Sequence, residues 1–248
     1  MCYHYSTMLT AKQMRDRFGL KDTRPDEQPT LFEPQHHVSG FNFPKMPVVL
    51  HREAGPELDY FYWGLIPRWA KNEEFAKGIR SKTLNARSET ITEKPSFRSA
   101  VKTNRCLIPA TGFYEWHTTS AKLKIPHYIY LESKEPFAFA GIYEEWLNHA
   151  TGELVPTYSI ITTAANPMMA HIHNSKGRMP VILPKAQENL WIDPSIPVSD
   201  AVSLLQPLDE AEMAAHTISK LITTRGANTN VPEVHAEHAW EGYTRPLF

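Results

Sequence analysis

The alternation of apolar and polar residues predicts short strands along most of the chain. Runs of aromatic and β-branched residues are bounded by proline, glycine or asparagine, which is typical of strands that pack one face against a core. Twenty prolines against eleven glycines also favour bounded loops and edge strands over long helices. We expect strands at residues 48–51, 60–64, 106–109, 128–132, 137–142 and 158–163.

Helix signals are fewer and more scattered. Thr10 as N-cap and Gly19 at the C-terminal end predict a helix over residues 10–19, and a second helix follows Pro184 at residues 185–192. Residues 21–36 are polar, contain prolines and predict a loop. Strands without regular βαβ alternation predict an α+β fold with a mixed or antiparallel sheet, as one domain over residues 1–248. Further helix candidates lie at residues 72–79, 97–102, 199–205 and 209–219.

Composition and charge narrow the function classes. No run of ~18 apolar residues predicts a membrane span, and the N-terminus lacks the basic and apolar regions of a secretory signal. We therefore expect a cytoplasmic protein. The net charge is −1, so a nucleic-acid partner would need a local basic groove. Two cysteines are too few for a disulfide framework or for a zinc site built from cysteines.

Cys2 is a candidate nucleophile because of its position. If Met1 is removed, the chain begins with a 1,2-aminothiol, whose α-amine has a pKa of roughly 8 and is partly unprotonated near neutral pH. Such a pair condenses with an aldehyde: the amine forms an imine, and the thiol closes a thiazolidine ring. Position alone favours the alternative, an arbitrary second residue without a role. An uncleaved Met1 would block the amine but leave the thiol.

Two polar segments add candidate chemistry. Asn85, Arg87 and Glu89 lie within five residues, which fits a site where an arginine contacts phosphate, or else a polar turn with a helix cap. Glu115 lies among aromatic residues, where a carboxyl tends to a raised pKa and can transfer protons, and Trp116 offers a face for a nucleobase. The alternative is a hairpin with an outward-facing Glu115.

His171 and His173 are spaced to lie on one side of a strand, a weak signal for a metal pair. The other histidine pairs, His36–His37 and His235/His238, lack carboxylate or cysteine companions nearby. We therefore expect no metal site and assign one histidine of the first pair to acid–base chemistry. Lys176 and Arg178 would then serve phosphates. Of the tryptophans that flank Arg68, we expect Trp63 in the core and Trp69 in a groove.

Seven segments in this order resemble the SOS response-associated peptidase (SRAP) family of abasic-site processing proteins. They are Met-Cys at the start, WGLIPRW, NARSE, RCLIPATGFYEW, FAGIYEEW, SIITTAAN and IHNSKGRMPVIL. The resemblance covers residues 1 to about 184. It implies the SRAP fold, a barrel-like sheet core with peripheral helices, in a monomer without a cofactor.

The resemblance also implies roles for individual residues. Cys2 matches the nucleophile that forms the thiazolidine crosslink to DNA, and Asn85 matches the residue that positions it. Glu115 matches the proton-transferring glutamate, and His173 matches the histidine beside the lesion. The expected DNA-binding residues are Arg87, Trp116, Thr162, Trp69, Pro44, Arg98 and Arg178.

The sequence departs from the family at two places. Many members begin Met-Cys-Gly-Arg, with an arginine that contacts DNA, whereas this chain has Tyr3 and His4 there. The family often has a basic residue where this chain has Pro95, for which Lys94 or Arg98 would compensate.

The predicted partner is single-stranded DNA that contains abasic sites, with the protein associated with the nucleoid when bound. Lyase activity and autoproteolytic or aminopeptidase removal of Met1 accompany this prediction. Two alternatives remain: a Cys2-dependent peptidase or hydrolase acting in trans, and a non-catalytic single-stranded DNA-binding module. Their products would distinguish them, since only the crosslinking protein leaves a DNA adduct.

Overall fold

The computed structural model describes residues 2–20 and 32–243. Its centre is a closed barrel of five strands, in the order β10 (Glu153–Ala164), β4 (Gly55–Trp63), β3 (Lys45–Arg52), β6 (Arg105–Ala110) and β9 (Phe137–Asn148). β9 pairs back onto β10 and closes the ring, and β10 with β4 is the one parallel pair within it. The prediction of an α+β fold with a barrel-like mixed sheet is confirmed.

Three short strands extend the sheet of the barrel. β5 (Asn85–Arg87) and β11 (Arg178–Pro180) both pair with β10, and β12 (Ile182–Leu183) pairs with β9. β10 therefore carries on its two edges the segments in which we expected Asn85, Arg87 and Arg178.

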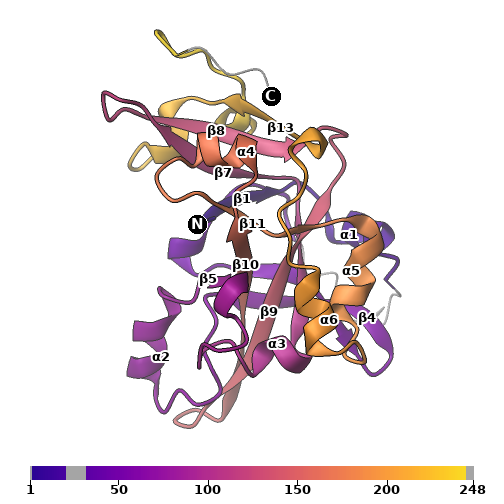
Figure 1. Ribbon diagram of the computed structural model, residues 1–248. Coiled ribbons are helices and arrows are strands. Elements are labelled where there is room, and N and C mark those ends of the chain that lie inside the picture. Colours follow the sequence, from indigo (N-terminus) through magenta and orange to yellow (C-terminus); the bar gives the residue numbers. More distant parts are fainter. Residues whose placement is uncertain (1, 21–31, 244–248) are drawn as a thin grey trace.

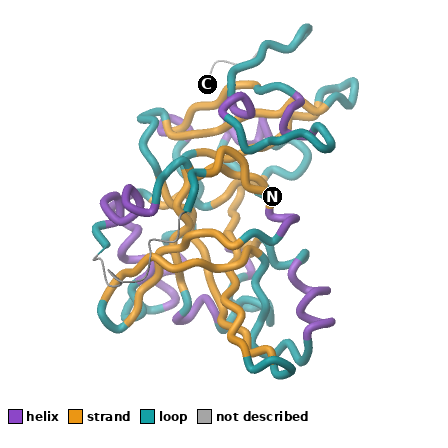
Figure 2. The backbone as a smooth tube through the Cα atoms, turned by 180° about the vertical axis from the view of Figure 1, so that it is seen from behind, coloured by secondary structure: helices purple, strands orange, loops and turns teal. Residues whose placement is uncertain are grey.

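A second sheet of five antiparallel strands lies across one end of the barrel, in the upper part of Figures 1 and 2. Its order is β13 (Met213–Thr217), β8 (Lys124–Leu131), β7 (Gly112–Thr118), β1 (His4–Thr7) and β2 (Gln35–Ser39). Tyr5 of β1 and Phe113 of β7 belong to the same buried cluster as the barrel interior. Apolar packing thus fixes the N-terminal strand at the mouth of the barrel.

The barrel has two apolar faces, and the period of two along each strand assigns residues to them. Val48 and Leu50 of β3 point into the barrel, whereas Val49 between them packs outward. The outward face is covered by α3 (Ala100–Thr103), α5 (Lys185–Ile192) and α6 (Val198–Ser203), of which α5 and α6 lie beside the barrel in Figure 1. Trp191 of α5 donates to the carbonyls of Cys106 and Gly141 and anchors this layer.

Most predicted elements are confirmed. All six expected strands coincide with observed strands, although those expected at 60–64 and 128–132 run one residue past β4 and β8. The expected helices appear as α1 (Ala11–Phe18), α2 (Glu73–Arg80), α3, α5 and α6. Thr10 caps α1 in a capping box, and Gly19 ends it with φ 62°. The remaining elements are α4 (Pro167–Ile172) and the 3-10 helices η1 (Gly40–Asn42), η2 (Ser88–Thr90), η3 (Glu210–Glu212), η4 (Lys220–Thr223) and η5 (Pro232–His235).

The predictions for residues 209–219 and for the end of the loop at 21–36 were wrong. Residues 209–219 form no α-helix; they contain η3 and the strand β13, because apolar residues of β13 pair with β8 and pack on the barrel core. The expected loop over residues 21–36 ends earlier, since β2 begins at Gln35 and pairs with β1; its residues 21–31 lie outside the described residues. Among the helices in the described ranges, none has the length and apolar character to cross a membrane.

Candidate active site

Cys2 lies just before β1, where the second sheet meets the barrel. Its side chain has no exposed surface, and its thiol donates to the backbone carbonyl of His4 at 3.7 Å. Burial raises the pKa of the Cys2 thiol far above its ordinary value, and Glu115 raises it further when its carboxyl is ionised. The sulfur is therefore a protonated thiol in the resting site, and it needs a proton acceptor before it can act as a nucleophile.

Glu115 occupies the middle of β7, with Tyr114 and Trp116 on either side. Only 4% of it is exposed, and burial raises the pKa of its carboxyl to about 8. The sequence-based prediction of a carboxyl with a raised pKa agrees with this environment. At neutral pH Glu115 is mostly a neutral acid, able to donate a proton and then to take one back.

His173 is the acid–base partner of Glu115. Its Nδ1 lies 3.6 Å from Glu115 Oε1 and donates to the backbone carbonyl of Arg178 at 2.9 Å. Because a carbonyl only accepts, the neutral ring carries its proton on Nδ1 and its lone pair on Nε2. Burial lowers the pKa of His173 to about 4, so at neutral pH His173 and Glu115 form an uncharged pair rather than a salt bridge.

The strand expected around His171 and His173 is not formed. His171 lies in the last turn of α4 and His173 is its C-terminal cap, because Asn166 caps the helix and Pro167 fits its first turn. His171 stacks on His117, with ring centroids 4.6 Å apart, and contacts neighbours other than those of His173. Among the described residues there is no group of three or more metal-ligating side chains.

A cavity of about 400 Å³ opens beside Glu115 and His173, and we call it the acid–histidine cavity. Trp116 is half-buried in its wall, and its expected stacking with a nucleobase stays a prediction. Its lining residues are Tyr3, His4, Glu115, Trp116, Thr118, Lys124, His173, Ser175, Lys176 and Thr223.

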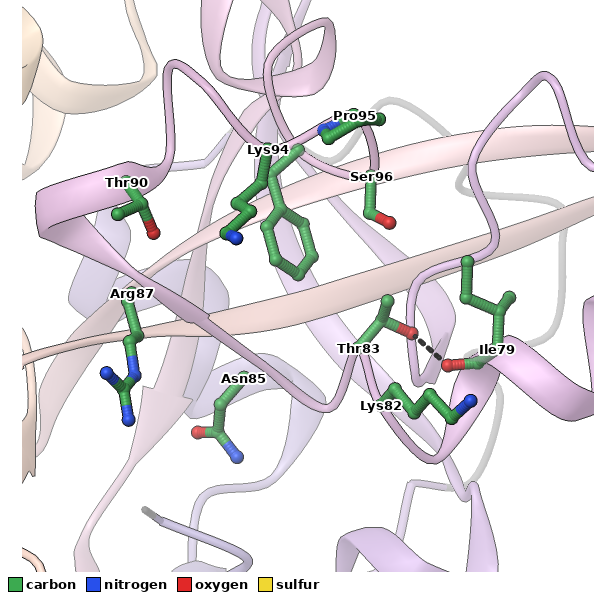
Figure 3. A pocket seen from close by; sticks show the side chains of 10 residues that line it. Ile79, Lys82, Thr83, Asn85, Arg87, Thr90, Lys94, Pro95 and Ser96 are labelled. Carbon is green, nitrogen blue, oxygen red and sulfur yellow. Dashed lines mark hydrogen bonds between the residues drawn. The ribbon is translucent and has the colours of Figure 1, made fainter.

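Asn85 lies on β5, in a second cavity of about 460 Å³ that we call the cationic cavity (Figure 3). Asn85 and Arg87 extend from the same side of their strand, as alternate residues do. Both amide atoms of Asn85 are buried without a hydrogen-bond partner among the described residues, which is costly unless a ligand satisfies them. The lining residues are Ile79, Lys82, Thr83, Asn85, Arg87, Thr90, Lys94, Pro95, Ser96 and Phe97.

Arg178 connects the two cavities. Its carbonyl holds His173, and its guanidinium binds Glu89 through two hydrogen bonds of 2.5 and 3.0 Å and the Thr162 carbonyl at 2.7 Å. Thr162 is buried and lies beside Arg87 in the β10–β5 register. Arg178 is 9% exposed and its guanidinium is engaged by protein groups, so its expected contact with DNA stays a prediction.

Other expected DNA-binding residues lie at the rim. Trp69 is 47% exposed and its indole donates to the Pro95 carbonyl at the cationic cavity, whereas Trp63 is fully buried in the core, as predicted. Arg98 is exposed after the same loop, and the half-buried Pro44 accepts from the Trp63 amide. Their contacts with DNA stay predictions.

Sequence reasoning missed several residues of the acid–histidine cavity. Lys124 and Thr223 line it, and His37 and Thr229 support it through His4. No local motif contains these residues, and only the pairing of distant strands brings them together.

The chain is similar in sequence to a known protein family and to individual proteins of that family. The family model described as SOS response associated peptidase (SRAP) matches residues 1–225. The abasic site processing protein YoqW of Bacillus subtilis (strain 168) is 37% identical over 96% of this chain and 100% of its own length. The abasic site processing protein HMCES of Xenopus tropicalis is 32% identical over 70% of this chain and 55% of its own length.

A solved structure is similar along nearly the whole chain. The crystal structure of a protein from Bacteroides thetaiotaomicron superposes with a TM-score of 0.88 at 38% identity, covering 96% of this chain and 100% of that one. The barrel and the crossing sheet are therefore an arrangement that this chain has in common with an experimentally determined structure.

Proposed function

Because the chain belongs to the SOS response associated peptidase (SRAP) family, we propose that it binds single-stranded DNA at abasic sites and links to the lesion covalently through Cys2. The family and the names of the relatives support abasic-site processing. The covalent chemistry and the preference for single strands are the parts that we propose from the site.

The proposed reaction needs Cys2 as the first residue, after cleavage of the Met1–Cys2 bond. The abasic sugar opens to its C1′ aldehyde, the Cys2 amine adds to C1′, and loss of one water gives an imine. The thiol then adds to the same carbon and passes its proton to nitrogen, which closes a thiazolidine ring. One water leaves and no electrons are transferred, so the reaction needs no cofactor.

Glu115 and His173 have the protonation states that these steps require. Ring opening moves a proton from the sugar hydroxyl to the ring oxygen, and the neutral Glu115 acid can supply one while the lone pair of His173 Nε2 receives the other. Dehydration to the imine again needs an acid. Both groups lie in a single cavity, and their burial excludes the water that would compete for protons.

The cationic cavity accounts for affinity in this proposal. An abasic site has no base to read, so recognition rests on backbone phosphates and on stacking of neighbouring bases. Arg87, Lys82 and Lys94 would bind phosphates, and the unpaired Asn85 amide would orient the reacting groups. Trp69 at the rim and Trp116 in the other cavity offer aromatic faces.

The observation that carries the proposal is the fully buried Cys2 thiol just before β1, the strand that pairs with the Glu115 strand β7. A Cys2-dependent hydrolase acting in trans would use a thiolate nucleophile, and the burial of this thiol raises its pKa, which disfavours that alternative. A thiol that adds to the imine carbon can pass its proton to the imine nitrogen during the step, so the resting site does not need to hold a thiolate.

The test is incubation of the purified protein with an abasic single-stranded oligonucleotide, followed by denaturing electrophoresis. We expect a covalent band that intact DNA and a tetrahydrofuran analogue without an aldehyde do not give. Cys2→Ala abolishes the band, while the matched control Cys106→Ala, which removes the other fully buried thiol, retains it. A band that survives Cys2→Ala, or no band with the wild-type protein, contradicts the proposal. A measurement of the intact mass reports whether Met1 is absent.

A further inference from the structure

His4, on β1, is held by two residues that are distant in the sequence. Its Nδ1 is 2.9 Å from Nε2 of His37 on β2, and His37 Nδ1 is 2.7 Å from the Thr229 hydroxyl. His4 pairs with Ser39 across β1 and β2, so His37 is its diagonal neighbour on the same face of the sheet. Thr229 lies beyond residues 1–225, which the family model matches.

Aromatic contacts fix the His4 ring from both sides. The rings of His4 and His37 stack with centroids 5.1 Å apart and 22° between their planes, and the edge of Trp116 meets His4 at 5.2 Å. Tyr114 meets His37 edge-on at 5.5 Å. Rotation of either imidazole would break these contacts and the hydrogen bonds, so the orientation of His4 is set before any ligand arrives.

Both imidazoles are uncharged. Burial lowers the pKa of His4 to about 3, with a further decrease from His37, and burial lowers the pKa of His37 to about 4. His4 Nδ1 is used by His37, which leaves Nε2 as the ring nitrogen that the acid–histidine cavity can use; within the described ranges it has no hydrogen-bond partner. Because the Thr229 hydroxyl can donate or accept, the direction of the hydrogen bonds from Thr229 through His37 to His4 can reverse. Nε2 of His4 can therefore be a donor or an acceptor.

We propose that His4 is a specificity-determining residue that presents a neutral, pre-oriented hydrogen-bonding nitrogen to the sugar–phosphate at the lesion, positioned by His37 and Thr229. The inference rests on the proposed function. It assigns phosphate neutralisation to the cationic cavity and gives His4 an uncharged hydrogen-bonding role. The segment that contains Thr229 becomes part of the site, although it lies outside the matched residues.

Salt dependence tests the proposal, because only charged contacts release counterions. Binding of single-stranded DNA with a tetrahydrofuran residue, which cannot crosslink, is measured from about 50 to about 300 mM salt. We expect His4→Gln to keep the wild-type slope of log K against log salt. His4→Arg should steepen the slope by about 0.7, the value for one added phosphate contact on a single strand.

The supporting residues are tested by affinity and rescue. Thr229→Val should weaken binding about fivefold at every salt concentration, as expected for one lost hydrogen bond, and Thr229→Ser should restore it. A shallower slope in His4→Gln, an unchanged slope in His4→Arg, or unchanged affinity in Thr229→Val overturns the inference. Thermal unfolding shows whether each variant is folded. If a variant is unfolded, His37→Gln, which alters the other residue that positions His4, takes its place in the affinity measurement.

Failure of the inference and failure of the proposed function give different results. The proposed function fails when no Cys2-dependent covalent band forms on abasic DNA. The inference fails on slopes and affinities measured with an analogue that cannot react.

Discussion

The acid–histidine cavity and the cationic cavity differ in the polar groups that are buried in each. In the first, Glu115 and His173 are buried, and burial shifts both pKa values so that the neutral forms predominate, while two lysines of the lining stay exposed. In the second, Arg87 and Lys94 remain exposed cations around the unpaired amide of Asn85. Proton transfer benefits from dry, neutral groups, whereas phosphate binding needs charges that meet the strand. The comparison predicts that variants in the two cavities change different measurements.

The largest effect is expected for Glu115→Gln, which removes the proton donor and acceptor at nearly constant volume. The crosslinking rate at saturating DNA should fall about 10²-fold or more, with DNA affinity almost unchanged. In the wild type the rate should rise with pH as the Cys2 amine, with a pKa of roughly 8, loses its proton, and fall as Glu115 ionises above about 8. Single-turnover rates against pH check this, and a falling limb that persists in Glu115→Gln contradicts the assignment.

The same substitution should stabilise the protein at alkaline pH. Burial in the folded state raises the pKa of Glu115 to about 8, because the site favours the neutral carboxyl. The contribution of this carboxyl to the free energy of unfolding is therefore complete below the ordinary carboxyl pKa. It is lost as the pH rises to about 8. Gln does not ionise and avoids that loss. Urea unfolding at pH 8 should therefore show Glu115→Gln to be more stable than wild type by a few kcal/mol, about 1.4 kcal/mol per pKa unit. The difference should disappear near pH 4.

Arg87→Ala tests the other cavity. We expect affinity for single-stranded DNA to fall about tenfold at low salt and the salt slope to become shallower by about 0.7, with the crosslinking rate at saturation retained. Lys185→Ala is the matched control, since Lys185 is an exposed cation at the start of α5 on the helix-covered side of the barrel. Equal losses in the two variants would mean that binding depends on overall charge rather than on this cavity.

The smallest effect is expected at the connection between the cavities. Glu89→Gln weakens the ion pair with Arg178, whose carbonyl orients His173. Because the Glu89 side chain is 48% exposed, solvent screening limits the loss of stability to about 1 kcal/mol, with a crosslinking rate lowered a few-fold. Asp16→Asn, in an exposed pair with Lys12, should change neither quantity. Unfolding by urea and single-turnover rates measure both.

Much of the site was predictable from local sequence. The NARSE segment and Glu115 among aromatics identified groups that line the two cavities, and the Met-Cys start identified Cys2, which is buried just before β1. The roles assigned to them, and the single domain over residues 1–248, stay predictions. The strand around His171 and His173 was a wrong prediction because spacing of two residues does not distinguish a strand from a helix end.

The barrel strands, the capped helices and the family were readable from the chain alone, because alternation, capping residues and ordered motifs are local properties. Which polar groups lose contact with water depends on the packing of the two sheets. Cys2 and Glu115 acquire their raised pKa values from residues of several strands, and His4 meets His37 across 33 residues. Desolvation depends on all the atoms around a group, most of them distant in sequence, and so it appears only once the sheets have packed.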